Sequence, residues 1–284
     1  MLKSLLAGIF LMGFGLAVAS PAHADEWSKK YSVSGKPSVR VETDDGDIEI
    51  SPGAANEVNA HVVTSGMKIS SSDVHVIESQ QGDHIELLVK TPKHWLTFSM
   101  GHHSVRVQIQ VPPQSDLDIR SGDGNVKSGP VAGHIQIDTG DGNIDSNGLH
   151  GDLHLHTGDG HVQGNDFDGN LSADSGDGYI TVRGRFDVLY LKSGDGNIEA
   201  EVQSGSKIAS GWNLHTGDGH INMKLPDGFS AELDAHTGDG HISLDFPVTV
   251  SGSISESRIH GKINGGGGML AITSGDGSIR IEKL

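Results

Sequence analysis

The sequence repeats one short unit, Ser/Thr-Gly-Asp-Gly-x-Ile/Val, at intervals that decide what the chain can fold into. The unit begins at Ser121, Thr139, Thr157, Ser175, Ser193, Thr216, Thr237 and Ser274. A divergent first copy begins at Thr43, where Asp44 replaces the first glycine. The spacing is 18 residues four times in succession, then 23, 21 and 37. Self-similarity at such a period indicates a repeat architecture, in which each unit packs mainly against its neighbours.

The apolar residues define two short strands in each repeat. If the Ser/Thr is position 0, positions −4 and −2 are apolar in every copy and position +5 is Ile or Val. This alternation on both sides of a turn predicts two strands, which must stack on those of the next coil at about 4.8 Å. We therefore expect an all-β fold: a parallel β-helix-like β-solenoid of about nine coils of 18–23 residues. The 37-residue gap predicts a degenerate coil at residues 248–263.

The Gly-Asp-Gly turn has two interpretations. Glycines at +1 and +3 allow positive φ and a close approach of neighbouring coils, and the aspartate can bond to N–H groups of its own turn. Alternatively, stacked carboxylates bind calcium, which would relieve their repulsion. That column would contain Asp123, Asp141, Asp159, Asp177, Asp195, Asp218 and Asp239. The sequence lacks the calcium-binding pattern Gly-Gly-x-Gly-x-Asp, which favours the structural interpretation.

Residues 1–24 have the features of a signal peptide. Lys3 precedes an apolar run at residues 5–19, and Ala22-His23-Ala24 fits a cleavage site, so we expect cleavage after Ala24. An uncleaved anchor is the alternative, but the run is shorter than the ~20 residues of a spanning helix, and no later segment could span a membrane. We expect export to the periplasm, the outer surface or the extracellular space.

The remaining chain divides into an N-terminal β region at 25–116, which includes the first repeat, and the solenoid at 117–284. Alternating runs at 58–64, 74–78, 84–89 and 105–111 predict a sheet that caps the N-terminal end. Residues 93–103 contain two aromatic residues, a methionine and three histidines. They form either a flap over the end of the core or a recognition loop.

Composition excludes several classes of partner and site. The formal net charge is −17, whereas nucleic acids and anionic lipids need a basic surface. The chain has no cysteine, so disulfides and thiolate metal sites are excluded.

Histidines flank two consecutive turns and suggest a metal site. If consecutive repeats stack in register, His215 lies beside His236 and His220 lies beside His241, with Asp218 or Asp239 as a third ligand. A spacing of about 4.8 Å suits two imidazoles on zinc, copper or nickel. The alternative is a set of solvated surface histidines without a cofactor.

Position −1 predicts a column of outward-facing charges. In sequence order it holds Arg120, Asp138, His156, Asp174, Lys192, His215 and His236. The first five alternate in sign when His156 is protonated, which would help to fix the register.

The motifs Val105-x-Val107-x-Ile109-x-Val111-Pro112 and Leu117-x-Ile119-x-Ser121-Gly-Asp-Gly precede the serial Thr-Gly-Asp-Gly turns. Together they resemble the bacterial "putative-adhesin" β-strand-repeat family, a head-GIN-like adhesin domain of unknown function. The resemblance covers roughly residues 30–284 and implies a secreted or envelope β-solenoid without catalytic residues. The histidine richness of this chain departs from many relatives.

Three classes of function follow. The first is an exported envelope protein with a structural, interaction or adhesin-like role, no catalysis and envelope or cell-surface partners. The second is a histidine-mediated metal-binding protein. The third is a polysaccharide-cleaving β-helix enzyme, which the 5% aromatic content disfavours, as does an aspartate that recurs in every coil. The sequence leaves the oligomeric state open.

We predict that mild acid promotes self-association. Cleavage after Ala24 would leave 16 histidines and a formal net charge of −18, which full histidine protonation would reduce to −2. Most of that change should occur between about pH 7.5 and 5.5, because histidine titrates near 6.5. Light scattering at low salt should rise over this interval, and a flat trace down to pH 5 would contradict the prediction.

Overall fold

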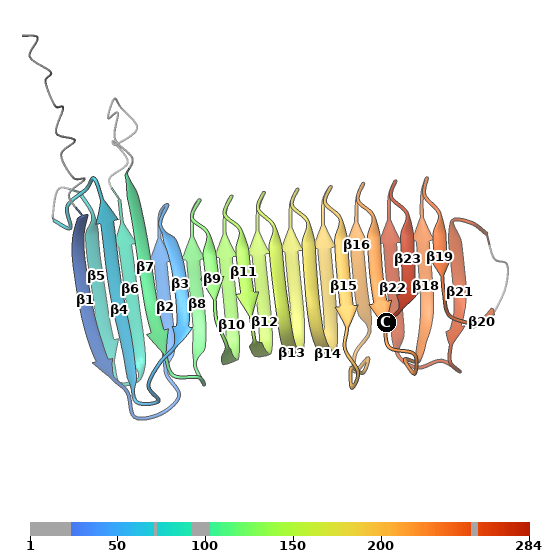
Figure 1. Cartoon of the computed structure of the whole chain (residues 1–284), viewed down its shortest axis with the longest axis horizontal. Coiled ribbons are helices and arrows are strands. Elements are labelled where there is room, and N and C mark those ends of the chain that lie inside the picture. The colour runs from blue at the N-terminus through green and yellow to red at the C-terminus, as the bar shows by residue number, and fades with distance from the viewer. Residues whose placement is uncertain (1–23, 71–72, 92–102, 251–254) are drawn as a thin grey trace, which may run out of the picture.

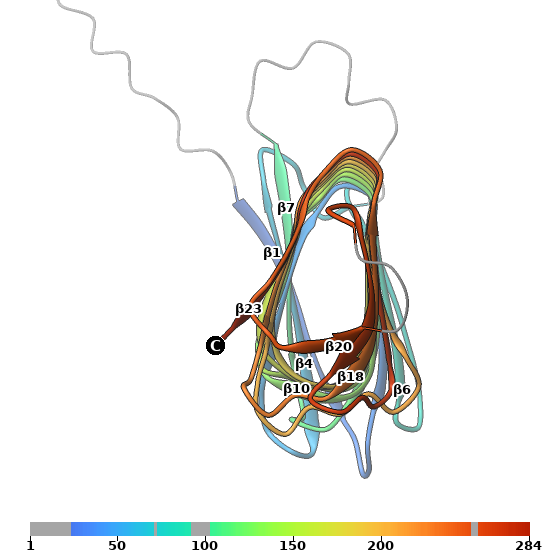
Figure 2. The same ribbon diagram turned by 90° about the vertical axis from the view of Figure 1, so that its right-hand side faces the viewer.

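The computed structural model describes residues 24–70, 73–91, 103–250 and 255–284, and it confirms an elongated all-β solenoid (Figure 1). Each coil contributes one strand to each of two facing sheets, joined by the repeat turn (Figure 2). The first sheet contains β2 (Ser38–Thr43), β8 (Asp116–Ser121), β10 (Val131–Thr139), β12 (Leu149–Thr157), β16 (Trp212–Thr216), β18 (Ala231–Thr237) and β22 (Met269–Ser274). The second contains β3 (Asp47–Pro52), β9 (Val126–Ser128), β11 (Ile144–Asn147), β15 (Ile198–Val202), β17 (Ile221–Leu225), β19 (Ile242–Leu244) and β23 (Ile279–Lys283). The long strands β13 (Val162–Ser175) and β14 (Ile180–Ser193) run from the second sheet into the first.

The alternation of the repeat places its apolar residues between the two sheets. Leu153, Leu155 and Val162 of one coil are buried, whereas His154 and His156 between them are exposed. Strands of successive coils pair in parallel and in register, so that Leu153 lies beside Ile135 on one side. Equivalent residues therefore form columns along the long axis, and the core is a stack of aliphatic layers.

A hydroxyl at position 0 connects each turn to the preceding one. Thr157 Oγ1 donates to the carbonyl oxygen of Gly142 at 2.8 Å and accepts from the amide of Gly160 at 3.1 Å. The bond to the neighbouring turn recurs for Ser121, Thr139, Ser175, Ser193, Thr216, Ser274 and Thr237. These hydroxyls are buried, and all but that of Thr139 also accept a bond from an amide of their own turn, which explains why the repeat has Ser or Thr here.

The turn glycines are needed for close approach. Gly122, Gly124 and their counterparts do not have positive φ, so that part of the prediction was wrong. A Cβ on Gly142 would instead lie 2.1 Å from the carbonyl oxygen of Gly124, and one on Gly160 would lie 2.0 Å from that of Gly142. A side chain at this position would push neighbouring coils apart.

The aspartates at position +2 were predicted to bond to N–H groups of their own turns, and this prediction was wrong. All are exposed and, among the residues the structure describes, accept no hydrogen bond. They form an acidic ridge along one edge of the solenoid, which consists of Asp45, Asp123, Asp141, Asp159, Asp177, Asp195, Asp218, Asp276 and Asp239. At the N-terminal end of the ridge, Asp45 is exposed but partly desolvated by the chain around it, and this desolvation, together with the charges of Asp123 and Asp44, raises its pKa.

The C-terminal end of the stack departs from sequence order. Strand β22 pairs with β16 on one side and with β18 on the other, and β23 lies likewise between β17 and β19. The last repeat of the chain is therefore inserted between the coils of Thr216 and Thr237. The predicted degenerate coil at 248–263 was also wrong. In its place, β21 (Arg258–Ile263) pairs antiparallel with β18, and β20 (Val248–Val250) pairs antiparallel with β21.

The N-terminal end carries the predicted capping strands. Strands β6 (His84–Lys90) and β7 (Ser104–Val111) pair in parallel with β2 and β3, so the first repeat lies between them and the coil of Ser121. Strands β5 (His75–Gln81), β4 (Glu57–Ser65) and β1 (Ala24–Ser32) then add in antiparallel orientation. The predicted signal peptide and most of the loop at 93–103 lie outside the described residues. In the part that is described, no helix is long and apolar enough to cross a membrane.

We predict that Thr157→Val destabilises the solenoid by about 2–4 kcal/mol, because the amide of Gly160 and the carbonyl of Gly142 would both lose a buried partner. Thr157→Ser keeps the hydroxyl and should cost about 1 kcal/mol. Urea unfolding followed by circular dichroism measures both values. Equal losses for the two variants would show that the hydroxyl bonds do not stabilise the stack.

We also predict that Asp45→Asn stabilises the protein at neutral pH. The raised pKa of Asp45 means that its charge opposes folding above that pKa, and that protonation at lower pH removes the penalty. Asp45→Asn should therefore raise Tm at pH 7 by about 1–2 °C, with the gain disappearing in acid and shrinking in high salt. The exposed Asp245, which lies outside the ridge, provides the control Asp245→Asn. A gain that persists at low pH would contradict the electrostatic explanation.

Candidate functional site

The four histidines of the predicted metal site are not neighbours in the stack. His215 lies beside Thr273 of β22, and Thr273 lies beside His236. The two histidines are thus separated by two strand spacings, or about 9.6 Å, rather than by one. The predicted adjacency was wrong because it assumed that coils stack in sequence order.

Position +4, which holds the histidines after the turns, links neighbouring coils. The Nδ1 atom of His220 accepts a hydrogen bond from the Ser278 amide at 2.9 Å, and Ser278 Oγ accepts from the amide of His241 at 3.2 Å. Asn143 Oδ1 does the same for the amide of His161 at 3.1 Å. Side chains at position +4 therefore share the task of bonding to the next coil. Within the described ranges, no group of three or more His, Asp or Glu residues could hold a metal ion.

The outward column at position −1 forms the predicted ion pairs in its first part. Arg120 Nε lies 3.8 Å from Asp138 Oδ2, and His156 Nδ1 lies 3.2 Å from Asp174 Oδ1. Lys192 Nζ is 3.8 Å from the other oxygen of Asp174. These side chains are a third to a half exposed, so each pair contributes little to stability. The column can favour one register but does not form a binding site.

A row of four adjoining hollows lies on the outer face of the second sheet, each sharing a lining residue with the next. One lies over β3, β4 and β7, the next over β3, β7 and β9, the third over β9, β11 and β13, and the last over β13, β14, β15 and β17. Neighbouring hollows share Glu49, Lys127 and Asn165 in turn, and each has a volume of about 210–350 Å³. We call this continuous surface the polar trough. It crosses nine strands, a length of about 38 Å along the solenoid axis.

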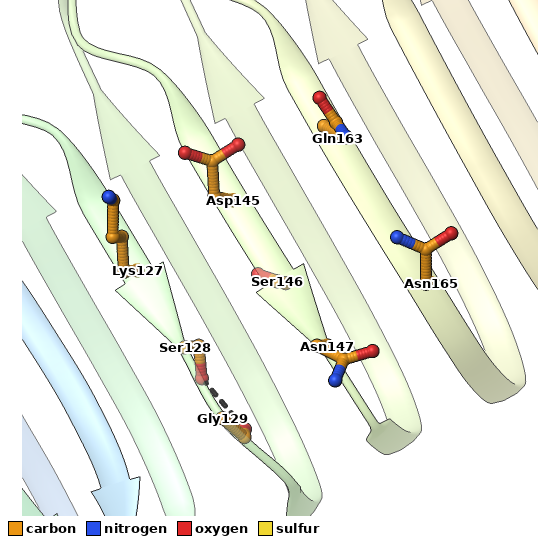
Figure 3. Close-up of a pocket in the computed structure, with 8 residues that line it drawn as sticks. All are labelled: Lys127, Ser128, Gly129, Asp145, Ser146, Asn147, Gln163 and Asn165. Carbon is orange, nitrogen blue, oxygen red and sulfur yellow. Dashed lines mark hydrogen bonds between the residues drawn. The ribbon is translucent and has the colours of Figure 1, made fainter.

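The strand register aligns the side chains of the trough in rows. Asp145 lies between Lys127 and Gln163 on three adjacent strands, and Asn147 pairs with Asn165. Figure 3 shows these five side chains on the outer surface of the ribbon. Outward positions of successive coils thus present hydrogen-bonding groups at the strand spacing.

The trough is nearly neutral on a strongly acidic protein. Its charged lining comprises four basic residues, Arg106, Lys127, Arg183 and Lys224, and five acidic residues, Asp47, Glu49, Asp145, Glu199 and Glu201. The whole chain has 20 basic and 37 acidic residues. Inside the trough, Arg183 Nε pairs with Glu201 Oε1 at 2.8 Å, and Gln108 Nε2 donates to Glu49 Oε2 at 3.0 Å.

An aromatic pair lies on the same outer face. The rings of His161 and Tyr179 stack with their centroids 4.5 Å apart and an interplanar angle of 8°. Tyr179 is 43% exposed, and Thr181, two residues further along the strand, lines the trough. This pair offers a flat aromatic surface beside a strip of amide and charged groups.

Sequence reasoning did not find the trough. Within the repeats, most of its outward residues occupy positions +6 and +8, which vary in type from coil to coil and therefore leave no motif, and the others come from the capping strands β4 and β7 or from position +4. One feature of the sequence could have indicated the trough: basic and acidic residues nearly balance at these positions, whereas the whole chain has a net charge of −17.

Several solved structures are similar to this chain over most of its length. The "putative lipid binding protein" from Parabacteroides distasonis ATCC 8503 matches with 13% identity, a TM-score of 0.50, and coverage of 92% of this chain and 98% of its own. The "putative adhesin" from Bacteroides fragilis NCTC 9343 matches with 9% identity, a TM-score of 0.41, and coverage of 91% and 97%. The "putative cell adhesion protein" from Clostridium sporogenes ATCC 15579 matches with 13% identity, a TM-score of 0.32, and coverage of 91% and 100%.

No curated protein matches the chain. The profile of the family described as Toastrack DUF4097, however, matches residues 37–282, which include every repeat turn and nearly all of the stack. The chain therefore belongs to the Toastrack DUF4097 family.

Proposed function

We propose that this is an exported, non-catalytic interaction protein that binds an extended, uncharged polysaccharide along the polar trough. The observation that carries the proposal is the continuity of the trough across successive coils. A surface about 38 Å long and only as deep as its side chains suits a polymer better than a compact ligand.

The chemistry of the lining favours a hydroxyl-rich ligand. Asn, Gln, Asp, Glu, Lys and Arg side chains dominate the trough, and they offer both donors and acceptors. Backbone groups beneath them are engaged in strand pairing, so a peptide cannot add there as a further strand. The balanced charge disfavours an anionic polymer, which the acidic remainder of the protein would repel.

Binding without catalysis is supported by how the carboxylates of the trough are held. Glu201 is neutralised by Arg183, and Glu49 accepts from Gln108. A glycosidase acid needs a raised pKa and a nearby carboxylate partner. Asp45, whose pKa is raised, lies on the acidic ridge rather than in the trough. Export rests on the signal-like residues 1–24 and would place the protein where such polymers occur.

We predict that a double change in the trough, Gln163→Ala with Tyr179→Ala, weakens binding to a soluble uncharged glucan about tenfold, because it removes an amide and the exposed aromatic ring. Affinity electrophoresis of residues 25–284 measures the change. The matched control, His154→Ala with Tyr190→Ala, alters exposed residues on the outer face of the first sheet.

The control should bind as the unmodified protein does, and alginate, which is anionic, should bind no variant. Equal binding by the trough and control variants would overturn the site. A polymer shortened during incubation would contradict the absence of catalysis.

A further inference from the structure

The C-terminal coil fills a slot between two other coils. Its main chain bonds to both, since the Gly275 amide donates to the carbonyl of Gly217 at 2.7 Å and the carbonyl of Gly275 accepts from Gly238 at 2.7 Å. The hydroxyl relay is continuous through it: Ser274 Oγ donates to Gly219 and Thr237 Oγ1 donates to Gly277, at 2.8 and 2.7 Å. Its inward side chains are fully buried, namely Leu270, Ile272, Ile279 and Ile281.

A second repeat, near the N-terminus, is also held between two coils, but its place in the chain order is different. The first repeat, β2 and β3, also lies between two coils, but both neighbours follow it in the chain and can add to it in turn. The coils of Thr216 and Thr237 precede residues 269–284 in the chain. Both walls of this slot are therefore synthesised before the two strands that fill it, and these strands have to be inserted between them if the walls fold first.

A short tether permits this entry. Residues 264–268 connect the end of β21 to the start of β22, and Asn264, Gly265 and Gly266 all have positive φ. A Cβ on Gly267 would lie 2.7 Å from the carbonyl oxygen of Ser230, and one on Gly268 would lie 2.6 Å from Ile208 Cγ2. The glycines let the chain return across the start of β18, where β21 ends and β22 begins.

We propose that a second copy of this chain can fill the slot, so that two molecules exchange their C-terminal coils, residues 269–284. The slot of each copy matches this segment of the other because the two chains are identical, and residues 269–284 keep the strand pairing and the buried contacts that they have in the monomer. Reciprocal exchange gives a closed two-fold dimer. A straightened tether from Ile263 to Met269 spans about 20 Å, so the copies would meet along the edge where both strands have these ends.

The protein concentration during folding determines whether a slot is filled by the C-terminal coil of its own chain or by that of another molecule. The tether holds the chain's own coil near its slot at a millimolar effective concentration, which favours the monomer in dilute solution. Exchange becomes competitive when many chains fold together. Once formed, the dimer separates slowly, because each inserted coil must break main-chain pairing on both of its sides.

Refolding tests the proposal on the chain of residues 25–284. After dilution from urea, size-exclusion chromatography with light scattering should show a dimer-to-monomer ratio that rises about tenfold for a tenfold increase in protein concentration. Deletion of Gly266 and Gly267 shortens the tether and hinders insertion of a chain's own coil. At the same protein concentration, this variant should therefore form a larger fraction of dimer than the wild-type chain does.

Cysteine pairs identify the exchanged segment, since the chain has no native cysteine. Asn213 and Ala271 are partners across β16 and β22. When Asn213→Cys and Ala271→Cys chains are refolded together, only exchange brings the two thiols into disulfide range, so a covalent dimer should appear on non-reducing gels. Ser172→Cys and Tyr190→Cys are partners across β13 and β14, which do not exchange, and should remain monomeric.

Absence of dimer at every concentration, for both the wild-type chain and the shortened tether, would overturn the proposal. A dimer without the Asn213–Ala271 cross-link would overturn it as well, because the copies would then associate by another surface. Equal cross-linking of the Ser172–Tyr190 control would have the same consequence. None of these results depends on polysaccharide binding, which is tested separately.

Discussion

The structure depends on the close stacking of the repeat turns. A main chain spaced at about 4.8 Å leaves no room for a Cβ at the turn glycines, and the hydroxyl at position 0 bonds to its own turn and to its neighbour. These two constraints fix the separation and the register of successive coils at one edge. The apolar positions on either side are then carried into the core in columns. Removing either constraint would leave aliphatic residues that fit the core but no device to align them.

This arrangement separates what must be constant from what can vary. Positions −4, −2, 0, +1, +3 and +5 are occupied by the stack, whereas outward positions are free to carry other chemistry. The protein uses that freedom in two ways. The turns present a ridge of exposed aspartates, and the outer face of the second sheet presents a nearly neutral strip of amides and paired charges. The net charge of −17 is thus unevenly distributed, and the proposed binding surface is a region where basic and acidic residues nearly balance.

The fold class, the places of the turns and the capping strands were predictable, because the inward alternation can be read from the residues, in the repeats as well as in the N-terminal runs. The order of the coils was not predictable in the same way. The repeats beginning at Thr237 and Ser274 have the same turn and the same inward apolar positions, so either can stack on the coil of Thr216. The 37-residue spacing showed that the stack is irregular between the repeats of Thr237 and Ser274. That length fits an extra coil, but it fits equally well a cap followed by two strands that insert between earlier coils. The predicted pairing of His215 with His236 was wrong for the same reason, since the two are neighbours only in sequence order.

The likeness between repeats has a further physical consequence. A coil that fits any neighbour leaves an exposed end able to accept coils from other molecules without limit. Antiparallel strands occupy both ends of the stack, β1, β4 and β5 at one and β20 with β21 at the other, and they break the parallel pattern there. Uncontrolled end-to-end growth is thereby disfavoured. The slot between the coils of Thr216 and Thr237 lies away from these antiparallel strands. Both of its walls are repeat coils that precede residues 269–284 in the chain. The exchange that we propose would therefore use a surface that the end strands do not cover, and it would be limited to a segment that matches the slot.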